Sequence, residues 1–257
     1  ETLSFYANRL TSLDVSKNPA LLWVECYDNQ LTSLDVRQNK NLKELFCANN
    51  QIDFLDVSGH DALTHLSVSG NQKLTHLHCF YCALTYLNVS GCTALETLQF
   101  HENQLTTVDV SDCTALKILY CIGNPLTTLD VSKNTALENL GAGENQLTEL
   151  NVSKCTALKE LRCFDNKLTT LDVSKNTALT YLDCSDNQLT SLDLSKNTAL
   201  TDLDCESNKL TSLDVSNNTA LQYMYCYNNQ LTELNVSRHS TLKSLNVRDN
   251  TKMEKLN

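Results

Sequence analysis

The sequence has 257 residues with 20 basic and 30 acidic side chains, which gives a net charge of −10 at neutral pH. No cluster of Lys and Arg offsets this charge, so the composition argues against a nucleic-acid partner, because phosphate binding needs concentrated positive charge. No apolar run reaches the roughly 18 residues of a membrane span, so we expect no membrane insertion by this segment. Glycine and proline number only 6 and 2, so another residue type must make the turns.

A repeat of 21 residues runs through the chain. We take Leu179–Ala199, LTYLDCSDNQLTSLDLSKNTA, as the template and number its first leucine as position 1. Apolar residues then recur at positions 1, 4, 6, 11, 14 and 16, and asparagine is usual at positions 9 and 19. Each repeat therefore consists of two similar parts, LxxLxCxxNx and LTxLDVSxNTA, which we call the first half and the second half.

Each half predicts one short strand, because its apolar and polar residues alternate with the period of a half-buried strand. Such a coil buries only a thin row of side chains and is stable only when it is stacked on its neighbours. We expect asparagine to turn the chain, because it tolerates the left-handed conformation and its side chain bonds nearby backbone groups. The predicted first-half strands follow Leu21, Leu42, Leu63, Leu74, Leu95, Leu116, Leu137, Leu158, Leu179, Leu200, Leu221 and Leu242.

One segment departs from the repeat. Leu63–Lys73, LTHLSVSGNQK, is a first half with no second half before Leu74 begins another repeat. Eleven residues cannot close a coil of this type, so we predict one coil of 32 residues with a bulge or loop near residues 58–73. The segment is either a dispensable insertion or a loop that displaces His65, Ser67 and Ser69 to shape a binding surface.

The motif LxxLxCxxNxL resembles the leucine-rich repeat signature. The 21-residue length and the cysteine at position 6 are similar to the cysteine-ladder repeats of internalin-type bacterial surface proteins. The resemblance covers nearly the whole chain and implies a β-rich solenoid of about 12 coils, with a parallel concave sheet and extended convex segments. It also implies an extracellular or cell-surface location. We expect one domain over residues 1–257, and a fragment of a longer protein, because neither end has an obvious cap.

Most of the 12 cysteines occupy core positions. Eight lie at position 6, where other repeats have Phe100, Ala142 or Val247, so cysteine acts there as a small apolar residue. Side chains in one column point the same way, so their Cβ atoms lie about 4.8 Å apart, farther than the roughly 3.8 Å of a disulfide, and we expect free thiols. The other four, Cys82, Cys92, Cys113 and Cys155, take asparagine positions.

The spacing Cys79-Phe-Tyr-Cys82, near His76 and His78, leaves two interpretations open. It is either a redox pair or zinc site, or two independent substitutions within the repeat. We favour the second, because a zinc site needs four converging ligands and a flat column of side chains does not converge. We therefore expect no metal and no cofactor.

Aromatic residues mark a predicted binding face. Positions 2, 3, 5, 7 and 8 point outward from the first-half strand and hold 12 of the 16 aromatic residues, whereas the second half repeats Asp, Ser and Lys. Tyrosine and tryptophan are enriched at binding hot spots. At Gly141–Gly143 we expect a depression in this face. The predicted ligand-binding residues are Tyr6, Trp23, Tyr27, Phe46, His76, His78, Phe80, Tyr81, His101, Tyr120, Phe164, Tyr181, Asp183, Asp204, Tyr223, Tyr225 and Tyr227.

These features predict a non-enzymatic recognition module of a bacterial surface or secreted protein. It would bind a protein or a glycan through the aromatic concave face, and the resemblance implies adhesion or host interaction. The alternative is a rigid structural spacer that displays another domain. An enzyme is the weakest hypothesis, because the sequence has no Gly-rich phosphate loop, HExxH or GxSxG motif.

Overall fold

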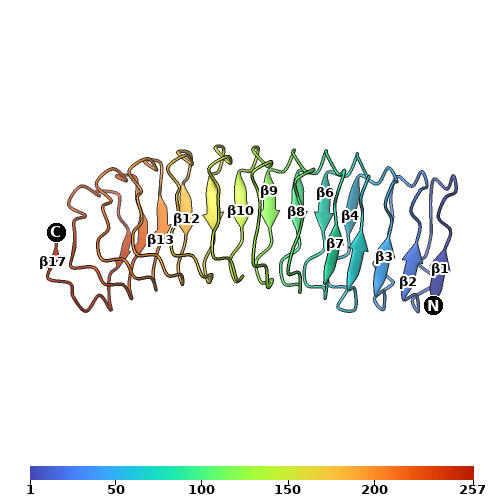
Figure 1. The fold of residues 1–257 in the computed structure, drawn as a ribbon, viewed down its shortest axis with the longest axis horizontal. Coiled ribbons are helices and arrows are strands. Elements are labelled where there is room, and N and C mark those ends of the chain that lie inside the picture. The colour runs from blue at the N-terminus through green and yellow to red at the C-terminus, as the bar shows by residue number, and fades with distance from the viewer. The chain divides into compact units, whose positions relative to one another are not determined.

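The computed structural model describes all 257 residues and contains 17 short strands and no helix (Figure 1). It accordingly has no helix that is long and apolar enough to span a membrane. The chain divides into two compact units, Glu1–Leu126 and Thr127–Asn257, which we call the N-terminal and C-terminal units. Both are stacks of parallel-strand coils, each one repeat long, so the predicted β-rich leucine-rich repeat solenoid is confirmed.

The strands of the N-terminal unit form two parallel sheets. We call the sheet with the order β1-β2-β3-β5-β7 sheet A, and the sheet in which β4, β6, β8 and β9 follow one another sheet B. Sheet A consists of β1 (Thr2–Ser4), β2 (Trp23–Glu25), β3 (Glu44–Phe46), β5 (His65–Ser67) and β7 (Tyr86–Asn88). Sheet B consists of β4 (Phe54–Asp56), β6 (His76–His78), β8 (Thr97–Gln99) and β9 (Ile118–Tyr120).

The prediction of a 32-residue coil is wrong. In sheet A, Glu44 pairs with His65 and His65 with Tyr86, each a single repeat length further along the chain. In sheet B, Phe54 pairs with His76, which is again close to a single repeat length. Residues 63–73 therefore add half a coil without lengthening any coil. The two halves have similar lengths and the same inward apolar pattern, so either half fits on either side of the stack.

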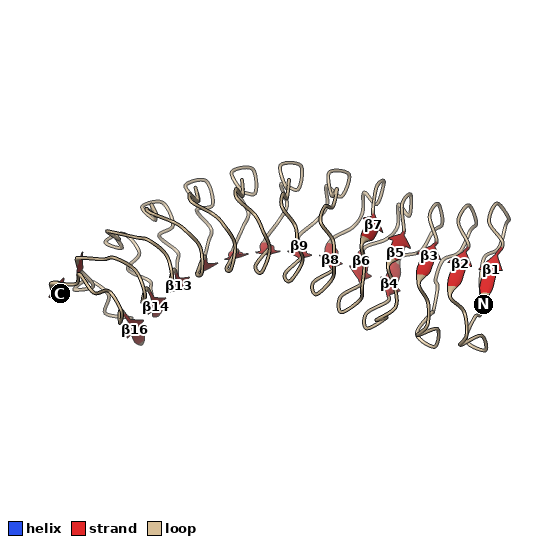
Figure 2. Ribbon diagram, turned by 60° about the horizontal axis from the view of Figure 1, so that its bottom comes forward, coloured by secondary structure: helices blue, strands red, loops and turns tan.

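This half coil moves the first halves from one sheet to the other. First halves form β1, β2, β3 and β5 in sheet A, but from residue 74 onward they form β6, β8 and β9 in sheet B (Figure 2). Two second halves also form strands: β7 lies in sheet A beside β5, and β4 lies in sheet B beside β6. The expectation of a single sheet that holds all first-half strands is therefore wrong for the N-terminal unit.

The C-terminal unit keeps one phase throughout. Its first-half strands pair in parallel at a constant offset of one repeat, as in Tyr181↔Asp202 and Asp202↔Tyr223. Two second-half strands, β15 and β17, form a separate pair. The strands are β10 (Asn139–Gly141), β11 (Glu160–Arg162), β12 (Tyr181–Asp183), β13 (Asp202–Asp204), β14 (Tyr223–Tyr225), β15 (Glu233–Leu234), β16 (Ser244–Asn246) and β17 (Lys255–Leu256).

The core consists of the predicted apolar positions. In most strands a buried central residue lies between two more exposed ones, as for Leu182 between Tyr181 and Asp183. Position 6 is fully buried whether it holds Cys163, Phe100 or Ala142, which explains why the column accepts different apolar residues. All twelve cysteines are free thiols, and burial raises the pKa of the Cys121 thiol to about 12.

The prediction for asparagine is confirmed only in part: its side chain bonds backbone groups, but asparagine at position 9 is not the left-handed residue. At position 9, Asn187 Nδ2 donates to the carbonyl oxygens of Cys163 (2.9 Å) and Ser185 (2.9 Å), and its Oδ1 accepts from the amide of Leu168 (2.9 Å). The left-handed residue is instead its neighbour Asp186, with φ of 49°. The asparagine side chain satisfies buried backbone groups of two adjacent coils, so it stays in an ordinary backbone conformation.

Other side chains replace asparagine at position 19 by making a similar bond. Asn39 Nδ2 donates to the carbonyl oxygen of Val15 at 3.0 Å. Cys92 Sγ donates to that of Val68 at 3.3 Å, and His239 Nε2 contacts that of Val215 at 3.1 Å. A thiol or an imidazole at this position therefore also ties one coil to the preceding one.

Candidate recognition surfaces

The outward face of sheet A carries a row of aromatic rings. Tyr6 and Tyr27 stack with ring centroids 4.7 Å apart and planes 6° apart, and Trp23 lies 5.8 Å from Phe46. The Tyr6 side chain is 48% exposed and that of Trp23 is 37% exposed. Stacking across adjacent strands holds the rings in fixed positions, so this face offers a preformed apolar surface.

Tyr86 extends this face, although it belongs to a second half of the repeat. It stacks on His65 at 5.9 Å in the neighbouring strand and is 44% exposed. Phe54 likewise belongs to a second half, yet it lies in sheet B beside the first-half residue His78. Both residues flank the half coil, and the shift of phase at residues 63–73 was the signal that could have placed them.

Sheet B carries a second cluster of rings. Phe80 stacks on His101 at 4.5 Å, and Tyr81 stands nearly perpendicular to His101 at 5.5 Å. His78 contacts the Phe54 ring edge-on at 5.6 Å. Burial lowers the pKa of His78 and of His101 below the ordinary value of 6.5, against the raising effects of Asp56 and Glu102. Burial therefore favours the uncharged form of both imidazoles, so the cluster presents aromatic rings with little positive charge.

The cysteines and histidines of this region do not converge. No group of three or more His, Cys, Asp or Glu side chains is placed to hold a metal ion. Cys79 is fully buried, whereas half-buried Cys82 Sγ donates to the carbonyl oxygen of Val57 at 3.2 Å. This bond matches the one made by asparagine, and it favours the interpretation of Cys79 and Cys82 as independent substitutions.

The C-terminal unit presents tyrosines that already contact cations of the same chain. The Arg162 guanidinium lies 4.9 Å from the centre of the Tyr181 ring, Lys243 lies 5.7 Å from that of Tyr223, and Arg248 lies 4.6 Å from that of Tyr227. The strand tyrosines Tyr181, Tyr223 and Tyr225 are half-buried. This face therefore combines rings with charge, whereas the two faces of the N-terminal unit are mainly apolar.

Carboxylates lie between these tyrosines. Asp183 Oδ1 accepts from the hydroxyl of Ser185 at 2.7 Å, and Glu206 Oε1 accepts from the hydroxyl of Tyr227. Burial, together with the nearby charges of Asp183 and Glu206, raises the pKa of Asp204 to about 7. The tyrosines therefore have carboxylates among them, but Asp204 carries only part of a charge near neutrality.

The predicted depression at Gly141–Gly143 is wrong. A Cβ atom on Gly143 would lie 2.5 Å from Cε1 of the Phe164 ring, and all three residues are buried. The ring of Phe164 thus covers the small residues of the preceding coil, and glycine is required there to admit it.

The predicted site residues fall into three groups, two in the N-terminal unit and one in the C-terminal unit. Sheet A has Tyr6, Trp23, Tyr27 and Phe46. Sheet B has His76, His78, Phe80, Tyr81, His101 and Tyr120. The C-terminal unit has Phe164, Tyr181, Asp183, Asp204, Tyr223, Tyr225 and Tyr227.

Comparisons with known proteins agree with this fold. A family model described as leucine-rich repeats (2 copies) matches residues 177–218. The functional domain of InlJ from Listeria monocytogenes, which includes a cysteine ladder, is 36% identical with a TM-score of 0.67, over 95% of this chain and 57% of that one. This chain thus spans little more than half the length of that relative. No curated protein sequence matches it.

Two further solved structures share the fold at lower identity. The leucine-rich repeat protein LIC12759 of Leptospira interrogans is 24% identical with a TM-score of 0.61, over 96% of this chain and 81% of that one. The internalin InlF of Listeria monocytogenes is 19% identical with a TM-score of 0.57, over 100% and 86%. The chain is a leucine-rich repeat protein of the cysteine-ladder type, similar to InlJ.

Proposed function

We propose that the chain is a non-enzymatic recognition module of a bacterial surface or secreted protein and that it binds a protein ligand through the outward faces of its strands. The observation that carries this proposal is the exposure of aromatic rings on strand faces. Tyr6, Phe54, Tyr81 and Tyr86 are 48%, 48%, 58% and 44% exposed. Rings held in fixed positions lose little entropy on binding, so they contribute more affinity than flexible side chains do.

The similarity to InlJ and InlF supports the bacterial and surface parts of this proposal, because this chain repeats the cysteine ladder of the first and the fold of both. The two ring faces of the N-terminal unit belong to different sheets, so each is a separate surface for a ligand.

The test uses the full chain on an array of extracellular host proteins and glycans. One variant removes the rings of sheet A (Tyr6, Trp23 and Tyr27 to Ala), and a second removes those of sheet B (His78, Tyr81 and His101 to Ala). The matched control changes the exposed Thr148, Thr169 and Thr190 to Ala. A protein hit that one ring variant loses at least tenfold, and that the control keeps, supports the proposal.

Other results point elsewhere. A glycan hit that is lost in the same way would replace the protein ligand by a carbohydrate. Hits that survive all three variants, or no hit at all, would favour the rigid spacer. Thermal unfolding of each variant separates lost binding from lost folding.

A further inference from the structure

The coil of residues 200–220, which contains β13, presents three carboxylates on its outward side. Asp202 and Asp204 lie in the strand and Glu206 follows it, so their alternate spacing points the three side chains the same way. All three are half-buried, and no Lys or Arg of the chain forms an ion pair with them. This coil therefore carries negative charge that the chain itself does not neutralise.

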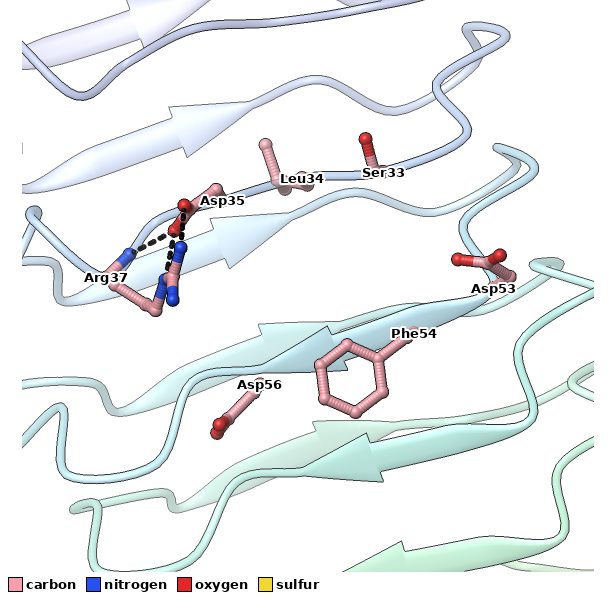
Figure 3. A pocket seen from close by; sticks show the side chains of 7 residues that line it. All are labelled: Ser33, Leu34, Asp35, Arg37, Asp53, Phe54 and Asp56. Atoms are coloured by element: carbon pink, nitrogen blue, oxygen red, sulfur yellow. Dashed lines mark hydrogen bonds and ion pairs between the residues drawn. The ribbon is translucent and has the colours of Figure 1, made fainter.

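Carboxylates at other places have cations of the chain beside them. In a cleft of about 340 Å³ between two second halves of the N-terminal unit, Arg37 folds back on Asp35, with Nη2 2.6 Å from Oδ2 (Figure 3). On the outward side of the C-terminal unit, Lys159 Nζ lies 2.6 Å from Glu138 Oε2 in the preceding coil. The three carboxylates of residues 200–220 differ from these, because they lie together without a cationic partner.

The ionisation of Asp204 reflects this excess of negative charge. Burial raises its pKa to about 7, the charges of Asp183, Glu206 and Asp186 act in the same direction, and the amide of Glu206, which donates to Oδ1 at 3.2 Å, opposes them. A cation beside Asp204 would stabilise the ionised carboxyl, so the binding of a cation and the ionisation of Asp204 favour each other. Above pH 7 most of this carboxyl is ionised, so an approaching cation meets a negative charge.

Tyrosine rings lie beside the three carboxylates. Each carboxylate has one on the next coil, and the pairs are Asp202–Tyr223, Asp204–Tyr225 and Glu206–Tyr227. The strand residues Tyr223 and Tyr225 are half-buried like the carboxylates, so part of each side chain faces solvent. A ring face attracts a cation through its quadrupole and a carboxylate attracts it through its charge, so this face can hold a cation in both ways.

Two of these three rings already contact a cation of the following coil, residues 242–250. The contacts are Lys243–Tyr223 at 5.7 Å and Arg248–Tyr227 at 4.6 Å, both measured to the ring centre. In the same coil Asn246 lies opposite Tyr225, and no cation of the chain lies over that ring. The Tyr225 ring, next to Asp204, is therefore the place on this face where a cation from outside the chain has no competitor.

We propose that the outward face of β13 and β14 binds a segment of a partner protein that carries an arginine or lysine, and that this cation lies over the Tyr225 ring beside Asp204. Asp202 and Glu206 add attraction for the same charge. The inference rests on the proposed function, because the partner binds an outward strand face, and it deepens that function by naming the chemistry of the partner. It concerns a face that the ring variants of the N-terminal unit leave unchanged.

The test follows the amide signals of the isotope-labelled full chain by NMR at about pH 7.5 during titration with acetyl-Gly-Ser-Arg-Ser-Gly-amide. We expect the signals of Asp204 and Tyr225 to shift. The analogue with citrulline in place of Arg keeps the shape of the side chain without its charge, and it should bind about tenfold more weakly. The comparison of the two peptides separates the contribution of the charge from every other contact.

A pair of charge variants locates the attraction. One neutralises the coil of residues 200–220 by Asp202→Asn, Asp204→Asn and Glu206→Gln, and it should weaken the Arg peptide about tenfold. The matched control removes the same number of exposed charges from second halves of the same unit, by Asp172→Asn, Asp193→Asn and Asp214→Asn. It should leave the affinity unchanged. Asn is compatible with these turns, because Asn151 at the same repeat position accepts from the Ser153 amide at 3.0 Å.

Variants of the ring and of its neighbour test where the cation lies. Tyr225→Phe keeps the ring and should keep the affinity, whereas Tyr225→Leu should weaken the Arg peptide about fivefold. Asn246→Arg places a cation of the chain opposite Tyr225, so it should compete with the peptide and weaken it by about the same factor. The melting temperature of each variant shows whether it still folds.

Three results would overturn the proposal: equal binding of the citrulline peptide, equal weakening by the control variant, or no shift at Asp204 and Tyr225 at millimolar peptide. Unchanged affinity in both Tyr225→Leu and Asn246→Arg would also overturn it, because the cation would then lie elsewhere. None of these results bears on the ring faces of the N-terminal unit, so the proposed function can stand where this inference fails. The array test and the peptide titration therefore fail independently.

Discussion

The two units contain the same repeat but present different surfaces. In the N-terminal unit, half a coil at residues 63–73 transfers the first halves from sheet A to sheet B, and all exposed large aromatic residues lie in this unit. In the C-terminal unit, first halves stay in one sheet, and three of the four tyrosine rings contact Arg162, Lys243 or Arg248. The phase of the half-repeats, and not the repeat itself, determines which side chains share a surface.

The interchange of halves has a simple physical basis. Either half places two buried residues on one short extended segment and ends in a turn that holds a buried donor, such as Asn50 or Asn39. The stack requires only these inward features, because outward side chains do not contribute to the core. The outward side is therefore free to differ, and an odd number of halves exchanges the two sides.

Deletion of Leu63–Lys73 should have the largest effect, because it restores the regular repeat spacing between Leu42 and Leu74. We expect a folded chain in which the strand of residues 76–78 pairs with β3, so that the rings of Phe46 and Phe80 lie in one sheet. Residues 54–56 should then lie between two second halves, instead of pairing with the first-half strand β6. A crystal structure of the variant checks this.

The converse deletion is a matched control. Removal of Leu189–Ala199, one second half of the C-terminal unit, should place Tyr181 and Tyr223 in different sheets. Either variant could instead keep the parent's arrangement of sheets by looping out another half-repeat. That result would refute the interchange of halves.

The buried asparagines should contribute equally to the free energy of unfolding in both units. Asn187→Ala removes the acceptor of the Leu168 amide and the donor to the Cys163 carbonyl, which leaves buried backbone groups without partners. We expect a loss of about 2–3 kcal/mol in the free energy of unfolding, measured by urea titration. Asn50→Ala in the N-terminal unit should cost a similar amount, and a loss below about 0.5 kcal/mol in both would show that these bonds do not support the stack.

The ionisation of Asp204 should make the stability of the C-terminal unit depend on pH. The pKa of Asp204 is about 7 in the folded chain and 3.8 ordinarily, so folding favours the protonated carboxyl. This contribution to the free energy of unfolding is fully present below about pH 4 and is lost as the pH rises towards 7. Asp204→Asn should therefore stabilise the chain at pH 8 by about 1 kcal/mol, after allowance for the exposed part of the carboxyl.

Stability measured from pH 4 to pH 8 checks the sign of this effect. The gain from Asp204→Asn should grow with pH across this range and vanish near pH 4. An equal gain at both ends would mean that the carboxyl does not titrate abnormally.

The cysteine column should give the smallest effect. Cys205→Val places in the column a residue that it already accepts at Val68, so we expect a change below about 1 kcal/mol in the free energy of unfolding. Cys205→Ser should cost more, because a hydroxyl would be buried without an assigned partner. Comparable costs for Val and Ser would show that the sulfur has a role beyond packing.

The sequence by itself determined the repeat, the buried positions and the free thiols. Leu161 and Cys163 are buried because strict alternation allows only one side of a strand to face the core, and this alternation can be read from the chain. The role of Asn187 was predicted only in part, because its hydrogen bonds depend on the preceding coil and not on its own turn.

Only the tertiary structure decided which residues share a surface. Phe54 and Tyr86 have the positions of scaffold residues in the repeat, yet β4 pairs with β6 and β7 with β5. Likewise, the small side chains around Gly143 predict a depression, but in the structure the Phe164 ring of the next coil covers this position. The inward pattern is fixed within each half-repeat, whereas a surface depends on how successive halves align, and the local sequence does not encode that alignment.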